Sequence, residues 1–171
     1  MLSSPVVDAD NTAYVLSPTT PRDHAELHAA FAVIVAQNEG YPQFPERPLS
    51  FEDFAVYWLQ SADIGFVARR RSDDALVGAY TMKPNGVGRA AHVANAGYFV
   101  RAEDRGRGLG ERLVRHSLDV ARARGYDAMQ FNFVFENNPA RRLYERLGFV
   151  VVGEVPAVIE GRPVYIYWRA L

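Results

Sequence analysis

The stretch Arg105-Gly106-Arg107-Gly108-Leu109-Gly110 decides the fold, because it joins an apolar segment to an amphipathic one. The segment before it ends at Phe99-Val100 and predicts a strand over 91–100. The segment after it repeats apolar residues at helical spacing, which predicts a helix to about Arg124. Glycines allow a close approach of the backbone, and a helix N-terminus offers N–H groups and partial positive charge. The stretch therefore predicts a loop that cradles a diphosphate, with Arg105 and Arg107 able to contact the phosphates.

Other glycine-rich loops share this chemistry, and their spacing separates them. An NTPase phosphate loop ends in Gly-Lys-Ser/Thr, whereas Gly110 is followed by Glu111-Arg112, so ATP hydrolysis is disfavoured. A dinucleotide fingerprint needs a third glycine that is missing after Gly108-Leu109-Gly110. An ordinary glycine turn before a helix stays open for the loop on its own, so the interpretation needs a second motif.

The rest of the chain reads as one alternating series of strands and helices, without an internal repeat. Asp23 is expected to cap a first helix and Ser50 a second. A further helix is expected over 138–148. Besides 91–100, the expected strands are 14–16, 64–68, 75–80, 129–135, 150–152 and 164–168. This order predicts a mixed α/β fold in a single domain over 1–171, with a loose end over about 1–10.

Composition excludes several classes of function. The formal net charge is -1 and the pI about 6.4, so the chain lacks the basic excess that supplies affinity for nucleic acid or anionic membranes. It contains no cysteine, which excludes disulfides, thiolate nucleophiles and cysteine-ligated zinc. No metal-binding pattern such as H-E-x-x-H is present. No signal segment or membrane-spanning run is seen, so a cytoplasmic protein is expected.

A second motif lies downstream, Asn137-Asn138-Pro139-Ala140-Arg141-Arg142-Leu143-Tyr144-Glu145-Arg146-Leu147-Gly148-Phe149. Together with the R-x-x-G-x-G pattern of 105–110, it resembles the GCN5-related N-acetyltransferase (GNAT) family. The resemblance covers about Ile64 to the C-terminus, and the N-terminal helices match only in general arrangement. It implies a mixed, mostly antiparallel, twisted sheet flanked by helices, with a central pair of parallel strands splayed apart.

The resemblance also implies that acetyl-CoA is the acetyl donor and lies in this splay. The backbone of Phe99 and Val100 would bind the pantetheine arm, and residues 105–110 would hold the pyrophosphate. Asn137 or Asn138 would contact the pantetheine from the other strand, and either alignment is allowed. Tyr144 occupies the position of the family's tyrosine, whose phenol would protonate the leaving thiolate. The cofactor residues implied are Phe99, Val100, Arg105, Gly106, Arg107, Gly108, Leu109, Gly110, Asn137, Asn138 and Tyr144.

The general base that many family members place on the strand before the glycine loop is missing here. The stretch His92-Val93-Ala94-Asn95-Ala96-Gly97-Tyr98 contains no carboxylate. Asn95 can orient an amine but cannot accept its proton. His92, Glu136 and a water relay are the remaining candidates.

The sequence indicates less about the acceptor site than about any other part of the protein. Lys83-Pro84-Asn85-Gly86, the stretch 92–100 and 131–135 resemble, more narrowly, the L-azetidine-2-carboxylate and proline-analogue acetyltransferase branch. This resemblance implies that Asn95 and Asn132, with one of Asn137 and Asn138, line the acceptor site and hold the nitrogen and the carboxylate of a small amino acid. Tyr41 and Phe44 are expected at its lip.

The sequence thus predicts an N-acetyltransferase for a small-molecule amine, with an amino acid or cyclic imino acid as one option. Asn95 would position the amine, and Tyr144 would donate the proton. Acetylation of proteins or peptides and a non-catalytic acetyl-CoA sensor remain as alternatives. We expect no nucleic-acid or membrane partner, and either a monomer or a homodimer.

Overall fold

A computed structural model of the protein describes residues 13–37, 40–41, 44, 48–159 and 161–171. The loose end expected over 1–10 lies outside the described residues, as do residues 42–43 and 45–47 around the expected lip residue Phe44. None of the helices in this part of the chain has the length and apolar composition needed to cross a membrane.

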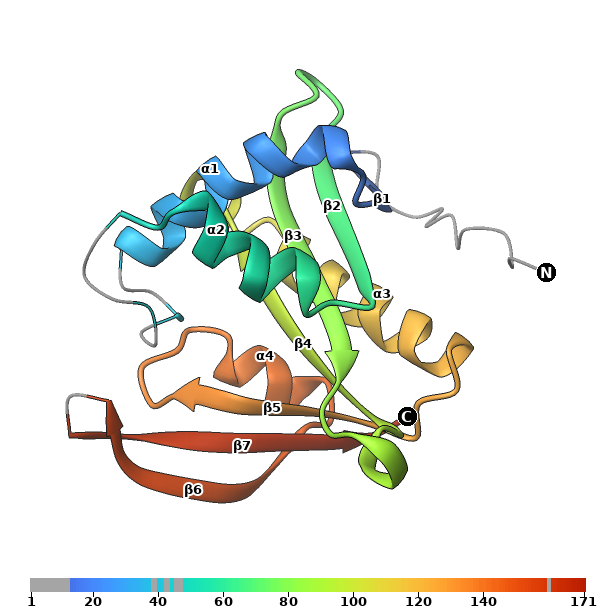
Figure 1. The fold of residues 1–171 in the computed structure, drawn as a ribbon, viewed down its shortest axis with the longest axis vertical. Coiled ribbons are helices and arrows are strands. Elements are labelled where there is room, and N and C mark those ends of the chain that lie inside the picture. Colours follow the sequence, from blue (N-terminus) through green and yellow to red (C-terminus); the bar gives the residue numbers. More distant parts are fainter. Residues whose placement is uncertain (1–12, 38–39, 42–43, 45–47, 160) are drawn as a thin grey trace.

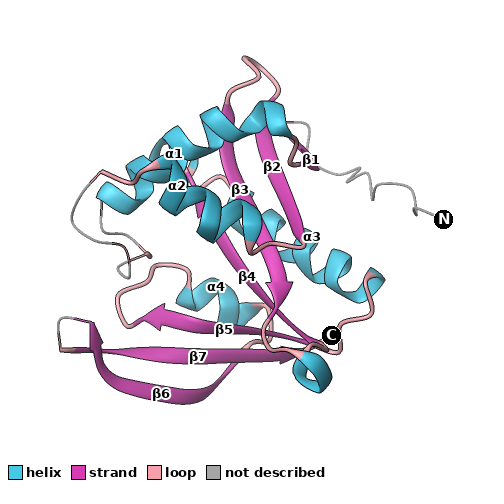
Figure 2. Ribbon diagram, viewed as in Figure 1, coloured by secondary structure: helices cyan, strands magenta, loops and turns pink. Residues whose placement is uncertain are grey.

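In the described part of the chain, seven strands form one sheet in the order β1-β2-β3-β4-β5-β7-β6 (Figures 1 and 2). Every neighbouring pair is antiparallel except β4 and β5, which are parallel. The expected mixed, mostly antiparallel sheet with a central parallel pair is confirmed. The strands are β1 (Tyr14–Pro18), β2 (Ile64–Arg70), β3 (Leu76–Pro84), β4 (Val93–Val100), β5 (Ala128–Phe135), β6 (Val150–Ile159) and β7 (Arg162–Ala170).

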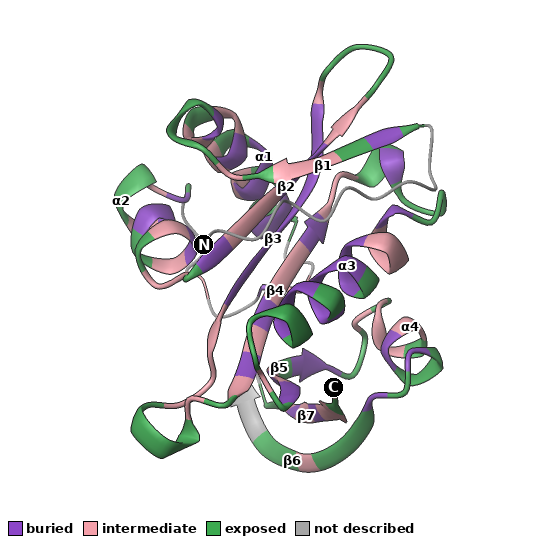
Figure 3. Ribbon diagram, turned by 90° about the vertical axis from the view of Figure 1, so that its right-hand side faces the viewer, coloured by how far each residue is buried: buried purple, intermediate pink, exposed green. Residues whose placement is uncertain are grey.

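Helices cover both faces of the sheet, as Figure 3 shows. On one face lie α1 (His24–Ala36), the short α2 (Phe51–Phe54) and the π-helix that continues α2, η2 (Ala55–Gln60). On the other face lie α3 (Leu109–Ala123) and α4 (Arg141–Arg146). Each side has its own apolar cluster, one around Phe31 and Trp58 and the other around Tyr80 and Phe131. Burial of these two faces is the main favourable contribution to folding.

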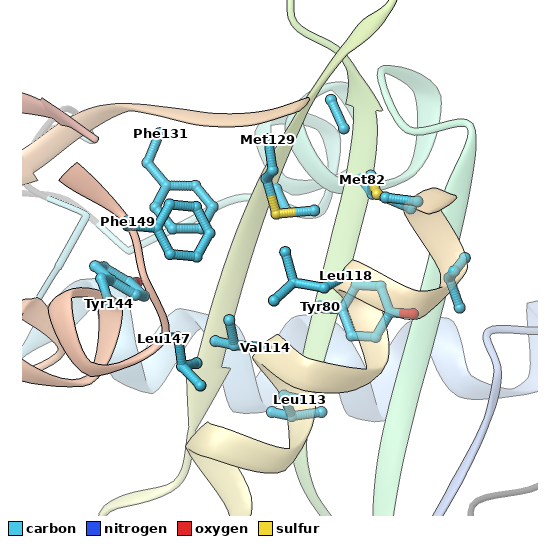
Figure 4. Close-up of a cluster of buried hydrophobic side chains, with 14 of the residues drawn as sticks. Tyr80, Met82, Leu113, Val114, Leu118, Met129, Phe131, Tyr144, Leu147 and Phe149 are labelled. Atoms are coloured by element: carbon cyan, nitrogen blue, oxygen red, sulfur yellow. The ribbon is translucent and has the colours of Figure 1, made fainter. Parts of the chain in front are cut away.

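The apolar pattern of α3 explains where this helix lies. Leu113, Val114, Leu118 and Ala121 are buried and point toward the sheet, and the first three can be followed in Figure 4. The helix ends at Ala123, and Gly125 follows the C-cap with a φ of +80°, a left-handed conformation that glycine adopts at low cost.

The capping predictions for the two N-terminal helices had different outcomes. Ser50 caps α2, since its Oγ accepts a hydrogen bond from the Asp53 N–H at 3.1 Å. Asp23 precedes α1 but does not cap it with its side chain. Its carboxylate instead accepts from Thr20 at 2.8 Å and pairs with Arg69 at 2.8 Å. That prediction was wrong because a charged partner on β2 competes for the carboxylate.

Candidate active site

The candidate active site opens where β4 and β5 separate. The two strands pair only at Val93 with Ala128 and at Ala94 with Met129. Beyond this point β4 stays paired with β3, and β5 stays paired with β7. Figure 1 shows the two strands diverging from the end where they meet. Their facing edges therefore present peptide groups that a ligand can bind.

Asn95 lies at the fork of this splay. Its Nδ2 donates to the main-chain oxygen of Gln130 at 2.9 Å, one residue beyond the last backbone pair. The side-chain amide thus takes over the link between β4 and β5 where the ladder ends. Because Nδ2 is engaged there, the acceptor Oδ1 is the atom of Asn95 best suited to meet an N–H group in the cavity.

A cavity of about 640 Å³ occupies the splay, a size typical of small-molecule sites. Its described walls come from β3, β4 and β5, the first turn of α3, α4, the π-helix η2 and the segment Gly40-Tyr41. Elements from both faces of the sheet meet here. The cavity therefore extends from the glycine loop to the face that carries the cluster around Phe31 and Trp58.

The glycine loop has the open, helix-initiating geometry that its sequence predicts. Gly106 and Gly108 have φ values of +72° and +83°, and Gly108 is the N-cap of α3. A Cβ at either position would meet no atom within 4 Å, so the backbone is accessible to a ligand. Leu109 is 1% exposed and packs into the core, where it anchors the helix. Arg107 is exposed beside this loop.

The segment before the glycine loop is held by a buried carboxylate. Asp104 is fully buried and accepts hydrogen bonds from Arg70 Nη2 at 2.7 Å and from the Tyr14 hydroxyl at 3.1 Å. The hydrogen bonds from Arg70 hold the pKa of Asp104 below its usual range. A charged tether to β1 and β2 thus fixes the start of the loop.

The peptide groups of β4 alternate between β3 and the splay. Arg101 N donates to Val77 O at 2.8 Å, and Asn85 N donates to Val93 O at 2.7 Å. The odd-numbered residues of β4 therefore face β3, because successive peptides of a strand point to opposite edges. The Phe99 peptide belongs to this set and pairs with Ala79, so Phe99 offers the cavity its side chain rather than its backbone.

Tyr98 and Val100 belong to the opposite set, and their peptides face the splay. The Tyr98 carbonyl accepts the Tyr41 hydroxyl at 2.7 Å, and the Val100 carbonyl accepts Arg105 Nε at 3.1 Å. These bonds occupy the two carbonyls and leave the N–H of Val100 directed at the open edge. Arg105 therefore braces the strand end and also lines the cavity.

Tyr144 reaches the cavity from α4. It is 8% exposed, and its ring centroid lies 4.7 Å from that of Phe131, which stacks on Phe149 at 4.6 Å (Figure 4). Burial raises the pKa of the phenol above its ordinary value, so the hydroxyl stays protonated at neutral pH. Among the described residues, no hydrogen bond engages this hydroxyl. It is a neutral donor on the wall of the cavity.

The two asparagines before α4 occupy different environments. Asn138 lines the cavity, and its Oδ1 accepts the Ala140 N–H at 2.8 Å, which forms the turn that leads into the helix. Asn137 is exposed and is not among the described residues of the wall. The geometry thus favours the Asn138 alignment.

A β-bulge directs Asn132 into the cavity. The register between β5 and β7 shifts between Phe131 and Val134, which places Asn132 and Phe133 opposite a single residue. Asn132 accepts from Gln130 Nε2 at 2.8 Å and donates to Asn85 Oδ1 at 2.7 Å. These three amides form one chain of hydrogen bonds along the acceptor side of the cavity.

Tyr41 and Tyr57 form an aromatic wall over Gly97. A Cβ at Gly97 would lie 3.2 Å from the Tyr41 hydroxyl and 3.4 Å from the Tyr57 hydroxyl. Tyr57 belongs to the π-helix η2, a distortion often found at functional sites, and burial raises its pKa to about 12. Phe44 packs edge-on against Tyr57 with centroids 5.0 Å apart, behind the wall that the cavity contacts.

The two candidate bases lie elsewhere. His92 is exposed and its Nδ1 contacts the Arg89 carbonyl at 2.8 Å, and Glu136 is exposed beside Arg141. Neither is among the described residues of the cavity wall, and that part of the wall contains no aspartate, glutamate or histidine. Of the three alternatives that the sequence left open, a water relay for the amine proton is the one that this geometry favours.

The sequence assigned no function to two residues of the cavity wall. Lys83 and Asn85 line the cavity from the end of β3. Their motif was visible in the sequence, but their direction follows from the pairing of β3 with β4, which the sequence does not specify.

Comparison with known proteins agrees with this geometry. Over 135 residues the chain is 50% identical to mycothiol acetyltransferase of Beutenbergia cavernae, covering 75% of this chain and 42% of that protein. Over 80 residues it is 39% identical to N-acetyltransferase aca1 of Schizosaccharomyces pombe, covering 46% of this chain and 38% of that protein. The chain spans less than half the length of these curated relatives.

A solved structure resembles the whole fold. A GCN5-related N-acetyltransferase from Kribbella flavida superposes with a TM-score of 0.84 at 31% identity, covering 93% of this chain and 98% of that one. The profile of the Acetyltransferase (GNAT) family matches residues 27–149, which is most of the chain and includes both sequence motifs. The chain therefore belongs to the Acetyltransferase (GNAT) family.

Proposed function

We propose that the protein transfers an acetyl group from acetyl-CoA to the amine of a small molecule. The observation that carries this proposal is the convergence of three features on one cavity. These are the splayed edge of β4, the glycine loop at the start of α3 and the protonated Tyr144 hydroxyl.

The residues of the cavity fit acetyl-CoA. Residues 105–110 would hold the pyrophosphate, since the loop is open and α3 directs its N-terminal N–H groups and partial positive charge toward it. The Val100 N–H would bind the pantetheine arm from β4, and Asn138 would contact it from the side of β5. When bound, acetyl-CoA supplies a thioester carbonyl that an amine can attack with loss of the CoA thiol.

The side chains that line the splay would orient the amine and donate the proton that the leaving group needs. Asn95 Oδ1 would accept an N–H of the attacking amine, which orients its lone pair toward the cavity. The Tyr144 hydroxyl would donate its proton to the departing sulfur and recover one from solvent. Because the described wall has no carboxylate or imidazole, the amine would enter as its neutral form and release its proton to water.

A small acceptor is favoured over a protein by the enclosed aromatic wall of Tyr41 and Tyr57 above Gly97. The similar mycothiol acetyltransferase is also named for a small molecule. An amino acid or cyclic imino acid is the finer proposal, because Asn95 and Asn132 bring amide groups to the same end of the cavity.

A non-catalytic acetyl-CoA sensor is the second candidate. The lack of an acidic or histidine side chain in the described wall favours it, whereas the protonated Tyr144 serves no purpose in a sensor. Acetylation of a protein or peptide would require the acceptor end to admit a chain.

The test is a screen for acceptor-dependent release of free CoA from acetyl-CoA. The panel contains free amino acids, cyclic imino acids, polyamines, aminoglycosides and peptides. We expect release with a small amine and none without an acceptor. Binding of acetyl-CoA without release by any member of the panel would support the sensor and refute the transferase.

A further inference from the structure

We infer that Lys83 and Asn85 form a carboxylate-binding subsite, so that the acceptor is a free amino or imino acid with its amine and carboxylate on one carbon. This inference rests on the proposed function and adds to it the class of substrate and the residues that select it.

Lys83 is placed directly beside the amine-binding atom. It is the register partner of Asn95 in the antiparallel pair of β3 and β4. Partners in such a pair point to the same face of the sheet, with Cβ atoms about 4.5–5.5 Å apart. Both residues line the cavity, and Lys83 is half-buried there. The two side chains therefore leave the sheet as neighbours on one wall of the cavity.

The charge of Lys83 is not balanced within the described residues. No described aspartate or glutamate forms an ion pair with it, and the only other charged residue on the described wall is Arg105, which is also cationic. Arg105 lies at the glycine loop, where the pyrophosphate is proposed to bind. The acceptor end thus has a cation that an anionic group of the substrate would neutralise.

The chain of hydrogen bonds through Gln130 and Asn132 leaves Asn85 as a hydrogen-bond donor. Gln130 Nε2 donates to Asn132 Oδ1, and Asn132 Nδ2 donates to Asn85 Oδ1. With its oxygen engaged, Asn85 presents its Nδ2 as a hydrogen-bond donor. Lys83 has three donors and no acceptor. Two adjacent donors, one of them charged, suit the oxygens of a carboxylate.

Asn95 has the opposite polarity, because its Nδ2 is bound to Gln130 and its Oδ1 remains as acceptor. An amine held at Asn95 and a carboxylate held at Lys83 must be close together, as the two side chains are cross-strand neighbours. An amine and a carboxylate on one carbon satisfy this spacing. A peptide N-terminus carries an amide at this position, and a polyamine carries a second cation that Lys83 would repel.

The experiment compares an amino acid with its carboxamide in the native protein and in three variants. Lys83→Met removes the charge and keeps the length of the side chain, whereas Lys83→Arg keeps the charge. Arg89→Met is the matched control, since Arg89 is an exposed cation on the neighbouring turn and is not on the described cavity wall. The amino acid is the best free acid found in the acceptor screen.

We expect the native protein to prefer the acid over the amide. Lys83→Met should raise KM for the acid roughly 10- to 100-fold, the usual effect of losing a charged hydrogen bond, and leave KM for the amide nearly unchanged. Lys83→Arg should restore most of the preference, and Arg89→Met should not alter it. The amines of the acid and of the amide differ in basicity, but this difference is the same for every variant. It therefore cancels when the ratio of the two KM values is compared between variants.

Equal use of acid and amide by the native protein, or an equal effect of Lys83→Met on both, would overturn the subsite and leave the transferase intact. Turnover of polyamines or peptides in place of amino acids would do the same. Absence of turnover with every amine, despite acetyl-CoA binding, would overturn the transferase and the subsite together.

Discussion

At the scale of single residues, the chemistry is proposed to depend on Tyr144 and Asn95. Tyr144 is kept protonated by burial against Phe131 and Phe149. Asn95 is oriented by the hydrogen bond from its Nδ2 to Gln130, which leaves its Oδ1 as the acceptor of the side chain. Both roles depend on neighbours that hold the polar atom in one direction, which is the requirement for preorganised catalysis.

Replacing Tyr144 with phenylalanine tests its role as the acid. Tyr144→Phe keeps the ring packing and removes only the hydroxyl, so we expect kcat to fall about 100-fold, within the usual range for general acid catalysis. The dissociation constant for acetyl-CoA should change less than about threefold. Steady-state kinetics and equilibrium titration measure the two effects. An unchanged kcat would exclude the acid role.

The pH dependence tests the route of the amine proton. The raised pKa of Tyr144 means that its acid form persists through neutral and mildly alkaline pH, so this group causes no loss of rate there. With no base on the described wall, kcat/KM for the acceptor should increase with pH until the free amine itself is deprotonated. A plateau at a pH well below the pKa of the amine would instead reveal a base on the protein.

The sequence predicts the local geometry of the glycine loop better than the directions of the side chains around the rest of the cavity. The glycine loop and Tyr144 belong to contiguous motifs whose spacing has a local physical meaning. The direction of Lys83, the engagement of the Phe99 peptide by Ala79 and the environment of Asn132 depend on strand register and on a bulge. These are long-range properties that local spacing does not encode.

At the scale of elements, the site depends on how β4 ends and α3 begins. The 3-10 turn Ala102–Asp104 between them is tethered through Asp104 to Arg70 and Tyr14. This tether holds the loop that is proposed to bind the pyrophosphate. Its loss should weaken cofactor binding without touching the acceptor end.

Asp104→Asn tests this tether. Because the fully buried Asp104 would lose its charge-assisted hydrogen bonds to Arg70, we expect a loss of about 2 kcal/mol or more in the free energy of unfolding and a higher KM for acetyl-CoA. The lowered pKa of Asp104 gives the native protein stability that is present above about pH 4 and lost as pH falls through that pKa, so the variant should depend less on pH there.

The control for this substitution is Asp73→Asn. Asp73 pairs with the same Arg70 at 2.6 Å, but its side chain is 48% exposed. Exposed ion pairs contribute less than about 1 kcal/mol, so this variant should keep its stability and its KM. Denaturant unfolding and kinetics at constant ionic strength measure both. Equal behaviour of the two variants would contradict the role given to Asp104.

Element order was predictable, and element ends were less so. The hairpin of β6 and β7 extends well beyond the expected 150–152 and 164–168, because Gly153 and Pro156 interrupt an apolar pattern that the pairing nevertheless continues. The sequence predicts a helix after Ser50 but not its π-helical stretch η2, in which Tyr57 and Trp58 pack against Phe31.

The whole molecule is a sheet whose two halves meet over only a short parallel contact. Strands β1 to β4 form one half, strands β5, β7 and β6 form the other, and α3 and α4 pack across the junction on one face. A ligand in the splay would contact both halves. Its binding should therefore stabilise the entire fold.

Acetyl-CoA should raise the melting temperature of the protein. At 100 times its dissociation constant it would add about 2.7 kcal/mol, which corresponds to roughly 5–10 °C for a chain of this size. ADP, which offers a diphosphate without a pantetheine arm, should give a smaller shift at the same concentration. Equal shifts would mean that the loop alone binds the ligand and that the splay contributes nothing.

The most direct test of acetyl transfer is a single turnover with isotopically labelled acetyl-CoA and the best acceptor of the screen, followed by mass spectrometry of acceptor and protein. We predict that the label appears as an amide on the acceptor and that the mass of the protein never changes. Release of CoA should require both acetyl-CoA and the acceptor. Bound acetyl-CoA with no labelled acceptor, or label retained on the protein, would contradict direct transfer in the splay of β4 and β5.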